Sequence, residues 1–167
     1  MPCEIKLRAP EPEDIDLIYI WENSSDEAHS SLRTGPISRY KIKEYVENYD
    51  GEIYTLGSLR FMIEYDGQKV GTADVFDFDH RARHAFIGIY ISPAFRRKGI
   101  AASAIKEVER QMKKKVGMYC LTALVAEDNI PSRSLFEKSG YKTAGKLQGW
   151  LTDGHQRLNA LIYQHIL

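Results

Sequence analysis

The sequence has few cysteines, no long apolar run and no excess of charge of either sign. The two cysteines, Cys3 and Cys120, are too few for a disulfide framework or a cysteine-rich zinc site, so we expect no metal. Cys120 lies in an apolar segment, where a small buried side chain is a better interpretation than a nucleophile. No run approaches the roughly 18 apolar residues of a transmembrane helix, and no signal peptide is recognisable. We therefore expect no membrane partner and a soluble, cytoplasmic protein.

The charge balance and the length of the chain predict a single domain that does not bind nucleic acid. The 23 basic and 23 acidic residues balance, so no basic field attracts nucleic acid, and we expect no nucleic-acid partner. The run Lys113–Lys115 is typical of the last turn of a helix, where cations offset the helix dipole. A length of 167 residues suits one domain with its own core. We expect that single domain to span residues 1–167.

The common nucleotide-binding motifs are also absent. Neither the P-loop spacing G-x-x-x-x-G-K-[ST] nor the dinucleotide-binding spacing G-x-G-x-x-G occurs. Instead, the apolar β-branched run Ile87–Ile91 predicts a buried strand that ends before Pro93. Three cations at 96–98 follow, then Gly99, and then small residues that begin a helical pattern. This order of residues needs a separate explanation.

A phosphate-binding loop explains why cations, a glycine and small residues follow the strand in this order. A loop of free N–H groups that leads into a helix N-terminus binds phosphate oxygens, and the helix dipole favours negative charge there. Gly99 and Ala101 leave the backbone accessible to those oxygens. We therefore predict a pyrophosphate cradle made of Arg96, Arg97, Lys98, Gly99, Ile100, Ala101 and Ala102. The alternative is an ordinary strand–loop–helix connection with a solvated basic face.

The cradle matches a known motif. The pattern R-x-x-G-x-A at Arg96, Gly99 and Ala101 resembles the acyl-CoA-binding motif of the GNAT superfamily of N-acetyltransferases. The segment Asn129–Tyr141 resembles the second signature of that family, N-x-x-[SA]-x-x-L-[YF]-E-K-x-G-[FY]. Two motifs in the expected order, about thirty residues apart, make the resemblance specific. Within that family, the chain resembles the branch that acetylates spermidine or the N-terminal alanine of ribosomal proteins.

The resemblance implies a set of cofactor contacts. In the family, the asparagine of the second signature and the small residue three positions later contact CoA. Asn129, Ser132 and Phe136 are therefore expected to contact CoA, with acetyl-CoA as the acyl donor. Helix capping is the alternative, because Asn129 is a good N-cap and Gly140 a good residue to end a helix.

Periodicity and turn residues predict an α+β order of elements. Strands are expected at Ile5–Arg8, Leu59–Tyr65, Lys69–Asp77, Ala85–Ile91, Tyr119–Ala126, Lys142–Leu151 and Arg157–Leu167. Helices are expected at Glu13–Asn23, Ser38–Tyr49, Ile100–Lys115 and from Asn129 to about Gly140, and Asp50–Ser58 is expected to be turn-rich. The pair Asp66-Gly67 predicts a tight hairpin.

The resemblance also implies how these elements are arranged. It predicts a single domain with a mixed, mostly antiparallel central sheet, flanking helices and two strands that splay apart. In the family, the pantetheine arm of CoA lies between the splayed strands. Backbone groups freed by the splaying then bond the amides of the arm, as an added strand would. We expect Ile89 and Ile91 to supply those backbone contacts.

The activity that the resemblance implies is transfer of an acetyl group from acetyl-CoA to a primary amine by direct attack in a ternary complex. The acceptor is a small molecule, a polyamine or a protein N-terminus. The reaction needs a neutral amine, whose conjugate ammonium has a pKa of about 10.4, and a proton for the departing thiolate. The family positions that often supply a glutamate base and a tyrosine acid are Phe86 and Phe136 here. Neither acid–base role transfers to those residues.

Other residues are candidates for that chemistry. His84 lies two positions before Phe86, and its ordinary pKa of about 6.5 suits a base, although an exposed turn histidine is the more frequent case. Tyr90 lies on the strand face of Phe86 and is a second catalytic candidate. Asp74, Asp77 and Asp79 alternate near the end of a strand, where one of them could bind the acceptor ammonium or all could be solvated. Tyr141 and Trp150 could line the acceptor pocket or belong to the core. We favour a water-assisted reaction in which positioning supplies much of the acceleration.

Two further interpretations stay open. Because Phe86 and Phe136 are apolar, the chain is alternatively a catalytically weak acyl-CoA-binding module that acts as a sensor or assembly partner. A phosphate-binding protein unrelated to CoA is a more distant alternative. The oligomeric state is also left open, with a homodimer as one alternative.

Overall fold

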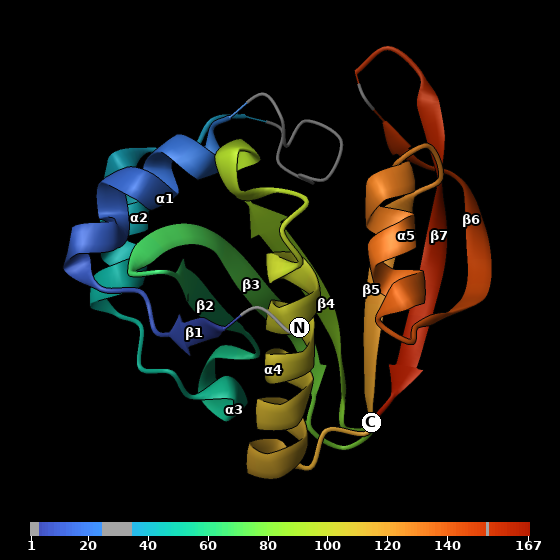
Figure 1. Ribbon diagram of the computed structural model, residues 1–167, viewed down its shortest axis with the longest axis horizontal. Helices are drawn as coiled ribbons and strands as arrows, with labels where there is room; N and C mark the ends of the chain where they lie inside the picture. The colour runs from blue at the N-terminus through green and yellow to red at the C-terminus, as the bar shows by residue number, and fades with distance from the viewer. Residues whose placement is uncertain (1–3, 25–34, 153) are drawn as a thin grey trace.

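A seven-stranded sheet runs through the computed structural model, which describes residues 4–24, 35–152 and 154–167 (Figure 1). The strand order is β1-β2-β3-β4-β5-β7-β6, and neighbouring strands are antiparallel except for the parallel pair β4–β5. The strands are β1 (Ile5–Arg8), β2 (Leu59–Tyr65), β3 (Gln68–Asp79), β4 (His84–Ile91), β5 (Cys120–Ala126), β6 (Lys142–Thr152) and β7 (Arg157–Ile166). The predicted strands and the mixed α+β class are confirmed.

The hairpin between β2 and β3 forms as its sequence predicts. Asp66 and Gly67 have φ of 51° and 71°, which a tight hairpin turn requires. β3 extends to Asp79, two residues beyond the predicted end, because its pairing with β4 continues past an irregularity to Asp79 and His84. Cys120 is buried in β5, as expected, and Cys3 lies outside the described residues.

The helices also follow the prediction, with one addition. They are α1 (Ile15–Glu22), α2 (Arg39–Glu47), α3 (Ile53–Leu56), α4 (Ile100–Val116) and α5 (Ile130–Lys138). A 3₁₀ turn, Pro12–Asp14, precedes α1, and another, Pro93–Phe95, follows β4. The segment Asp50–Ser58, which was expected to be turn-rich, also contains the short helix α3. A single helical turn shows too little apolar periodicity to be recognised in a sequence.

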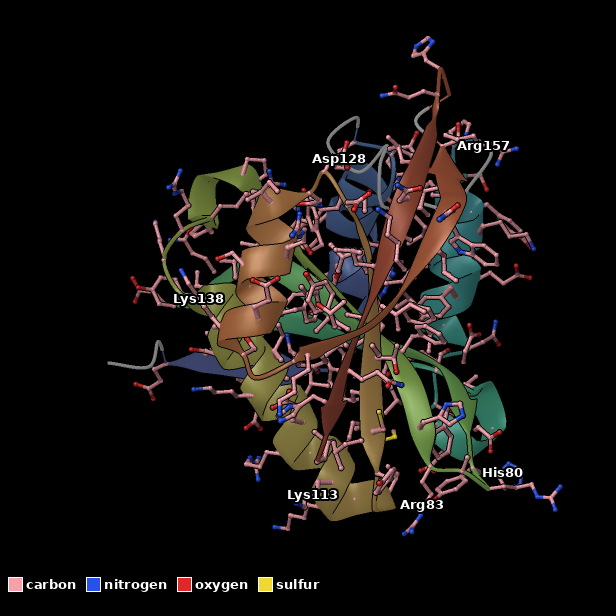
Figure 2. All side chains as sticks on the ribbon, turned by 90° about the vertical axis from the view of Figure 1, so that its right-hand side faces the viewer. His80, Arg83, Lys113, Asp128, Lys138 and Arg157 are labelled. Carbon is pink, nitrogen blue, oxygen red and sulfur yellow. The ribbon has the colours of Figure 1, made fainter. Side chains whose placement is uncertain are left out.

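Helices cover both faces of the sheet. On one face, α1 and α2 pack Ile18, Trp21, Ile42 and Val46 against Met62 of β2. On the other face, α4 buries its predicted apolar stripe, which consists of Ile100, Ala104, Ile105, Val108 and Met112. Figure 2 shows α4 and α5 on one side of the sheet and the α1–α2 pair on the other. The last turn of α4 carries Lys113–Lys115, as predicted.

The parallel pair β4–β5 is short, and this positions the functional site. The two strands pair only where each begins, His84–Phe86 against Cys120–Thr122. β4 then continues to Ile91 alongside β3, and β5 continues to Ala126 alongside β7. No further pairing joins β4 to β5 within the described part of the chain. The predicted splaying of two strands is therefore confirmed.

Candidate active site

A cavity of about 550 Å³ lies where β4 and β5 separate. β4 contributes its segment 87–90 to the cavity wall, and β5 contributes Leu124. Ser132 and Phe136 of α5 complete that side of the wall. The opposite side is formed by α1, α2, β2 and β3, through residues that include Trp21, Glu22, Tyr45, Arg60 and Asp74. One space thus reaches from the splayed strands to the helices on the other side.

The cradle at the start of α4 has the backbone geometry of an anion site. Arg97 and Gly99 both have left-handed backbones, with φ of 63° and 79°. Gly99 is the N-cap residue of α4 and has no side chain that could accept a hydrogen bond from the first N–H groups of the helix, at 100–102. The first turn carries no acidic residue. These N–H groups and the helix dipole suit the oxygens of a pyrophosphate.

Glycine at position 99 suits its left-handed backbone conformation. A Cβ atom there meets no protein atom within 4 Å, but a φ of 79° is strained for any L side chain. Arg97 and Lys98 are exposed beside it, and the Lys98 ammonium lies 5.1 Å from the centre of the Phe95 ring. Two exposed cations beside the first N–H groups of the helix suit the negative charge of a pyrophosphate.

Arg96 has a different role from its two basic neighbours. Its Nε donates a hydrogen bond of 2.8 Å to the carbonyl oxygen of Ile91, and its guanidinium lies 5.9 Å from the centre of the Tyr90 ring. The Tyr90 ring in turn lies 5.6 Å from the ring of Trp21. Both Tyr90 and Trp21 line the cavity. Arg96 therefore fastens the cradle to the end of β4 and to the cavity wall.

The second motif forms a capped helix beside the cavity. The Oδ1 atom of Asn129 accepts a hydrogen bond of 3.1 Å from the backbone N–H of Ser132, so helix capping accounts for Asn129. Ser132 and Phe136, further along α5, lie in the cavity wall. In Figure 1, α4 and α5 both begin in the upper half of the view, on either side of the gap between β4 and β5.

Three charged side chains meet on the wall opposite α5. Arg60 donates from Nη1 to Glu22 at 2.5 Å, and from Nε and Nη2 to the two oxygens of Asp74 at 2.6 and 3.1 Å. Burial lowers the pKa of Arg60, but the charge and hydrogen bonds of Asp74, with Glu22, outweigh it and hold the pKa above its ordinary value. The Tyr45 ring lies 5.9 Å from this guanidinium, and burial raises the pKa of Tyr45. We call Glu22, Arg60 and Asp74 the charged triad.

The structure separates the two predicted catalytic residues. Tyr90 lies in the cavity wall, half-buried. His84 is exposed at the first position of β4 and pairs with Cys120, outside the cavity wall, which begins on this strand at Ile87. Figure 2 shows Arg83, the residue before His84, at the end of the molecule where Lys113 lies and away from Asp128. The structure does not bring His84 to the cavity.

Of the remaining candidates for the acceptor site, some lie in the cavity wall and others lie outside it. Asp74 lies in the cavity wall, whereas Asp79 accepts from the backbone N–H groups of Arg81 and Ala82 in a turn. Tyr141 is buried in the core, with its ring centre 5.0 Å from that of Phe136, and Trp150 is largely exposed on β6. Phe86 stacks on Phe76 at 5.7 Å, and Phe76 reaches the cavity.

Sequence reasoning missed two residues of the site, Glu22 and Arg60. Glu22 carries no local signal, because a glutamate at the end of a helix is ordinary. Arg60 does carry one, since it is a cation within the apolar strand Leu59–Tyr65. A buried charge in a strand needs a partner on the neighbouring strand, and here Arg60 lies directly opposite Asp74.

A mixed sheet in which the parallel pair β4–β5 opens beside a helix N-terminus suited to phosphate is the arrangement expected for a CoA-dependent acyltransferase. The sequence profile of the Acetyltransferase (GNAT) family matches residues 18–141. The chain belongs to that family.

Individual relatives agree with this assignment. The chain is 28% identical over 171 residues to spermidine N(1)-acetyltransferase of Escherichia coli K12, covering 96% of this chain and 87% of the relative. It is 30% identical over 149 residues to an uncharacterised N-acetyltransferase of the SPβ prophage of Bacillus subtilis 168, covering 86% and 79%. The crystal structure of spermidine N-acetyltransferase from Vibrio cholerae with CoA and spermine has the same fold, with a TM-score of 0.86 at 19% identity, over 97% of this chain and 95% of that one.

The expected activity is thereby confirmed. The protein is an N-acetyltransferase that transfers an acetyl group from acetyl-CoA to an amine, and the alternative of a binding module without transfer chemistry is not favoured. No helix in the described ranges is long and apolar enough to cross a membrane.

Proposed function

We propose that the acceptor of this acetyltransferase is a polyamine and that it binds in the cavity beside β4. The observation that carries the proposal is the cavity itself, which joins the splayed strands and α5 on one side to the charged triad on the other. Carboxylates on the triad side suit the ammonium groups of a polyamine. The likeness to a spermidine acetyltransferase over 96% of the chain supports the same acceptor.

The donor would bind along the opposite side. In this proposal the N–H groups of Ile100, Ala101 and Ala102, with Arg97 and Lys98, hold the pyrophosphate. The pantetheine arm lies between β4 and β5, where the backbone of Ile89 and Ile91 extends beyond the last parallel pair. Gly99 sets the turn, and Arg96 holds that turn on β4.

Asn129, Ser132 and Phe136 would contact the arm from the side of α5. Ser132 and Phe136 are supported by their place in the cavity wall. The Oδ1 atom of Asn129 is engaged in capping, so its contribution is to fix the start of α5 beside the arm. The acetyl group then faces the cavity near the point where the strands separate.

The chemical step balances with water as the proton acceptor. The ammonium of the acceptor gives one proton to solvent, and the neutral nitrogen attacks the thioester carbonyl carbon. A C–N bond forms, the C–S bond breaks, and the thiolate of CoA takes a proton from the nitrogen or from water. The products are the N-acetylamine and CoA thiol, with one proton released. We propose that Tyr90 positions the amine or a bridging water, and that positioning supplies most of the acceleration.

A screen of amines against acetyl-CoA tests this proposal. Free thiol would be measured with spermidine, a simple monoamine and a peptide with a free N-terminus. Spermidine is expected to be the best acceptor, and Asp74→Asn should raise its KM by about tenfold, the effect of one charge-assisted hydrogen bond. A peptide N-terminus acetylated faster than any polyamine would contradict the proposal and identify the other expected acceptor.

The organisation of the chain completes the proposal. We propose one domain over residues 1–167, located in the cytoplasm, that assembles with further copies of itself, as the spermidine N-acetyltransferase of Vibrio cholerae does in a dodecameric structure. Light scattering on the purified protein measures the mass in solution: a mass of two chains would identify the homodimer, and a mass of one chain would contradict self-assembly.

A further inference from the structure

We propose that Arg60 limits the cavity to one acceptor ammonium group, and so determines which amines are preferred. This inference rests on the proposed polyamine acceptor and concerns the charge of the same site. Within the described part of the cavity wall, the charged side chains are the two acids and one base of the charged triad. Their formal charges leave a single net negative charge.

The positive charge of Arg60 is fixed in place. Its guanidinium is bonded by both oxygens of Asp74 and by Glu22, and the Tyr45 ring covers it. Its backbone N–H donates to the hydroxyl of Tyr49 at 3.1 Å, and that hydroxyl donates back to the Arg60 carbonyl at 3.0 Å. A guanidinium held by two carboxylates does not lose its proton near neutral pH. The acceptor must therefore bind beside this charge.

The charges of the triad act strongly because they are partly shielded from water. The side chains of Arg60, Glu22 and Asp74 are 17%, 18% and 27% exposed. Partly buried charges are screened by salt much less than surface charges. An ammonium that enters the cavity without a counter-charge therefore costs more than the same ammonium in solvent.

The net charge of −1 on the charged triad balances the single ammonium group of a diamine whose other nitrogen is neutral and ready to react. The reacting nitrogen must be neutral, so a diamine carries one remaining ammonium, which the triad can balance. A monoamine has no ammonium left for the triad, and a triamine has one more than the triad can neutralise. The second ammonium is therefore expected to improve the acceptor greatly, and the third only slightly.

The test is a charge series with a common reacting end. kcat/KM would be measured by thiol release for propylamine, 1,3-diaminopropane and spermidine, with wild type and variants. In wild type we expect about a tenfold or larger rise from monoamine to diamine, the effect of one charge-assisted contact. From diamine to triamine we expect a rise of less than about threefold, since the third charge lacks a partner.

Variants separate the charge of Arg60 from its packing. Arg60→Met removes the positive charge at similar volume, so the diamine-to-triamine rise should grow to about tenfold. Arg60→Lys keeps the charge and should keep the wild-type pattern, which a packing effect alone would not do. If Arg60→Met does not fold, Glu22→Gln gives the independent test: it neutralises the triad, and the monoamine-to-diamine rise should fall toward one.

The outcomes distinguish this inference from the proposed function. Turnover of polyamines with the same diamine-to-triamine ratio in wild type and Arg60→Met would overturn the inference alone. A wild-type preference for the triamine of tenfold or more would also overturn it. Turnover of monoamines or peptides with none of either polyamine would overturn the polyamine proposal and the inference together.

Discussion

The guanidinium of Arg96 lies 5.9 Å from the centre of the Tyr90 ring while its Nε bonds the Ile91 carbonyl. Through this pair, the loop that is suited to phosphate is attached to a side chain in the wall of the acceptor cavity. The Trp21 ring also contacts Tyr90, at 5.6 Å between ring centres. We therefore expect binding of the donor to be coupled to the order of the cavity wall through these side chains.

Arg96 and Arg97 are expected to differ when each is replaced. Arg97→Met should raise the KM for acetyl-CoA alone, because the Arg97 side chain is exposed at the cradle. Arg96→Met should raise the KM for acetyl-CoA and also that for the amine, by about three- to tenfold, since a hydrogen bond and a cation–π contact are lost. Initial rates measured with acetyl-CoA varied, and then with the amine varied, give both KM values for each variant. An amine KM that stays at the wild-type value in Arg96→Met contradicts the link.

Gly99→Val is expected to abolish donor binding and leave the fold intact. The φ of 79° is strained for valine, so the cradle must change its conformation although nothing blocks the side chain. Wild type with acetyl-CoA at 100 times its Kd should gain about 2.7 kcal/mol of stability, seen as a rise in Tm. Gly67→Val is the matched control, because Gly67 has a φ of 71° and open space but lies in the β2–β3 turn. The Tm of Gly67→Val should be lower than that of wild type, but acetyl-CoA should still raise it. If acetyl-CoA raises the Tm of Gly99→Val as much as that of wild type, the donor binds elsewhere.

Phe136→Leu is expected to raise the KM for acetyl-CoA more than it lowers kcat. Phe136 packs on Tyr141 and Tyr163 and forms part of the cavity wall, so its loss loosens the wall without removing an acid or base. Phe136→Tyr adds a hydroxyl and is expected to leave kcat unchanged or raise it modestly. A large fall in kcat at unchanged KM for the leucine variant would mean that the ring acts in the chemical step.

His84→Ala is expected to share the pH profile of wild type. The imidazole is exposed and lies outside the cavity wall, so water is the better proton acceptor. A histidine base is active when neutral, which means above a pKa of about 6.5, and its removal lowers kcat most above that pH. Measuring kcat from pH 5.5 to 9 tests this, and a wild-type inflection that disappears in the variant would identify His84 as the base.

Asp14 is expected to make the stability of the fold depend on acid pH. Burial raises the pKa of this carboxyl, but hydrogen bonds from Arg8 and Lys69 outweigh it and lower the pKa from 3.8 to about 2. A lowered folded-state pKa contributes stability that is present above pH 4 and lost as the pH falls toward 2.

The expected size of this effect is about 2 kcal/mol, and unfolding in urea at several pH values measures it. Asp14→Asn should be less stable at pH 7 and should lose that part of the acid dependence. Asp128→Asn, at an exposed position, is the control. Equal acid dependence of wild type and Asp14→Asn would contradict the role assigned to this ion pair.

The sequence predicted the cradle and the strands around it because their signals are local. A strand that ends before Pro93, a basic loop with Gly99 and a helix with small first residues are all found within sixteen positions. The short helix α3 gave no such signal, because four residues do not complete an apolar period.

The charged triad was hidden by a register shift. From the turn at Asp66-Gly67, Tyr65 pairs with Gln68, and an unbroken ladder pairs Arg60 with Ala73. The irregularity between Ile63 and Glu64 moves the partner of Arg60 to Asp74. A β-bulge leaves no reliable mark in a sequence, and Glu22 reaches the site only through packing of α1 on the sheet. The loop and helix of the proposed donor site could therefore be predicted from the sequence, whereas on the side of the proposed acceptor only Asp74 and Tyr90 could.

The most direct test of the central claim is thiol release from acetyl-CoA with spermidine by wild type, set beside the variant Asp74→Asn. The account predicts saturable release, one thiol for each acetylated amine, and about a tenfold higher spermidine KM in the variant at an unchanged KM for acetyl-CoA. Tight acetyl-CoA binding without thiol release from any amine would contradict it, as would a spermidine KM that does not respond to the loss of the Asp74 carboxylate.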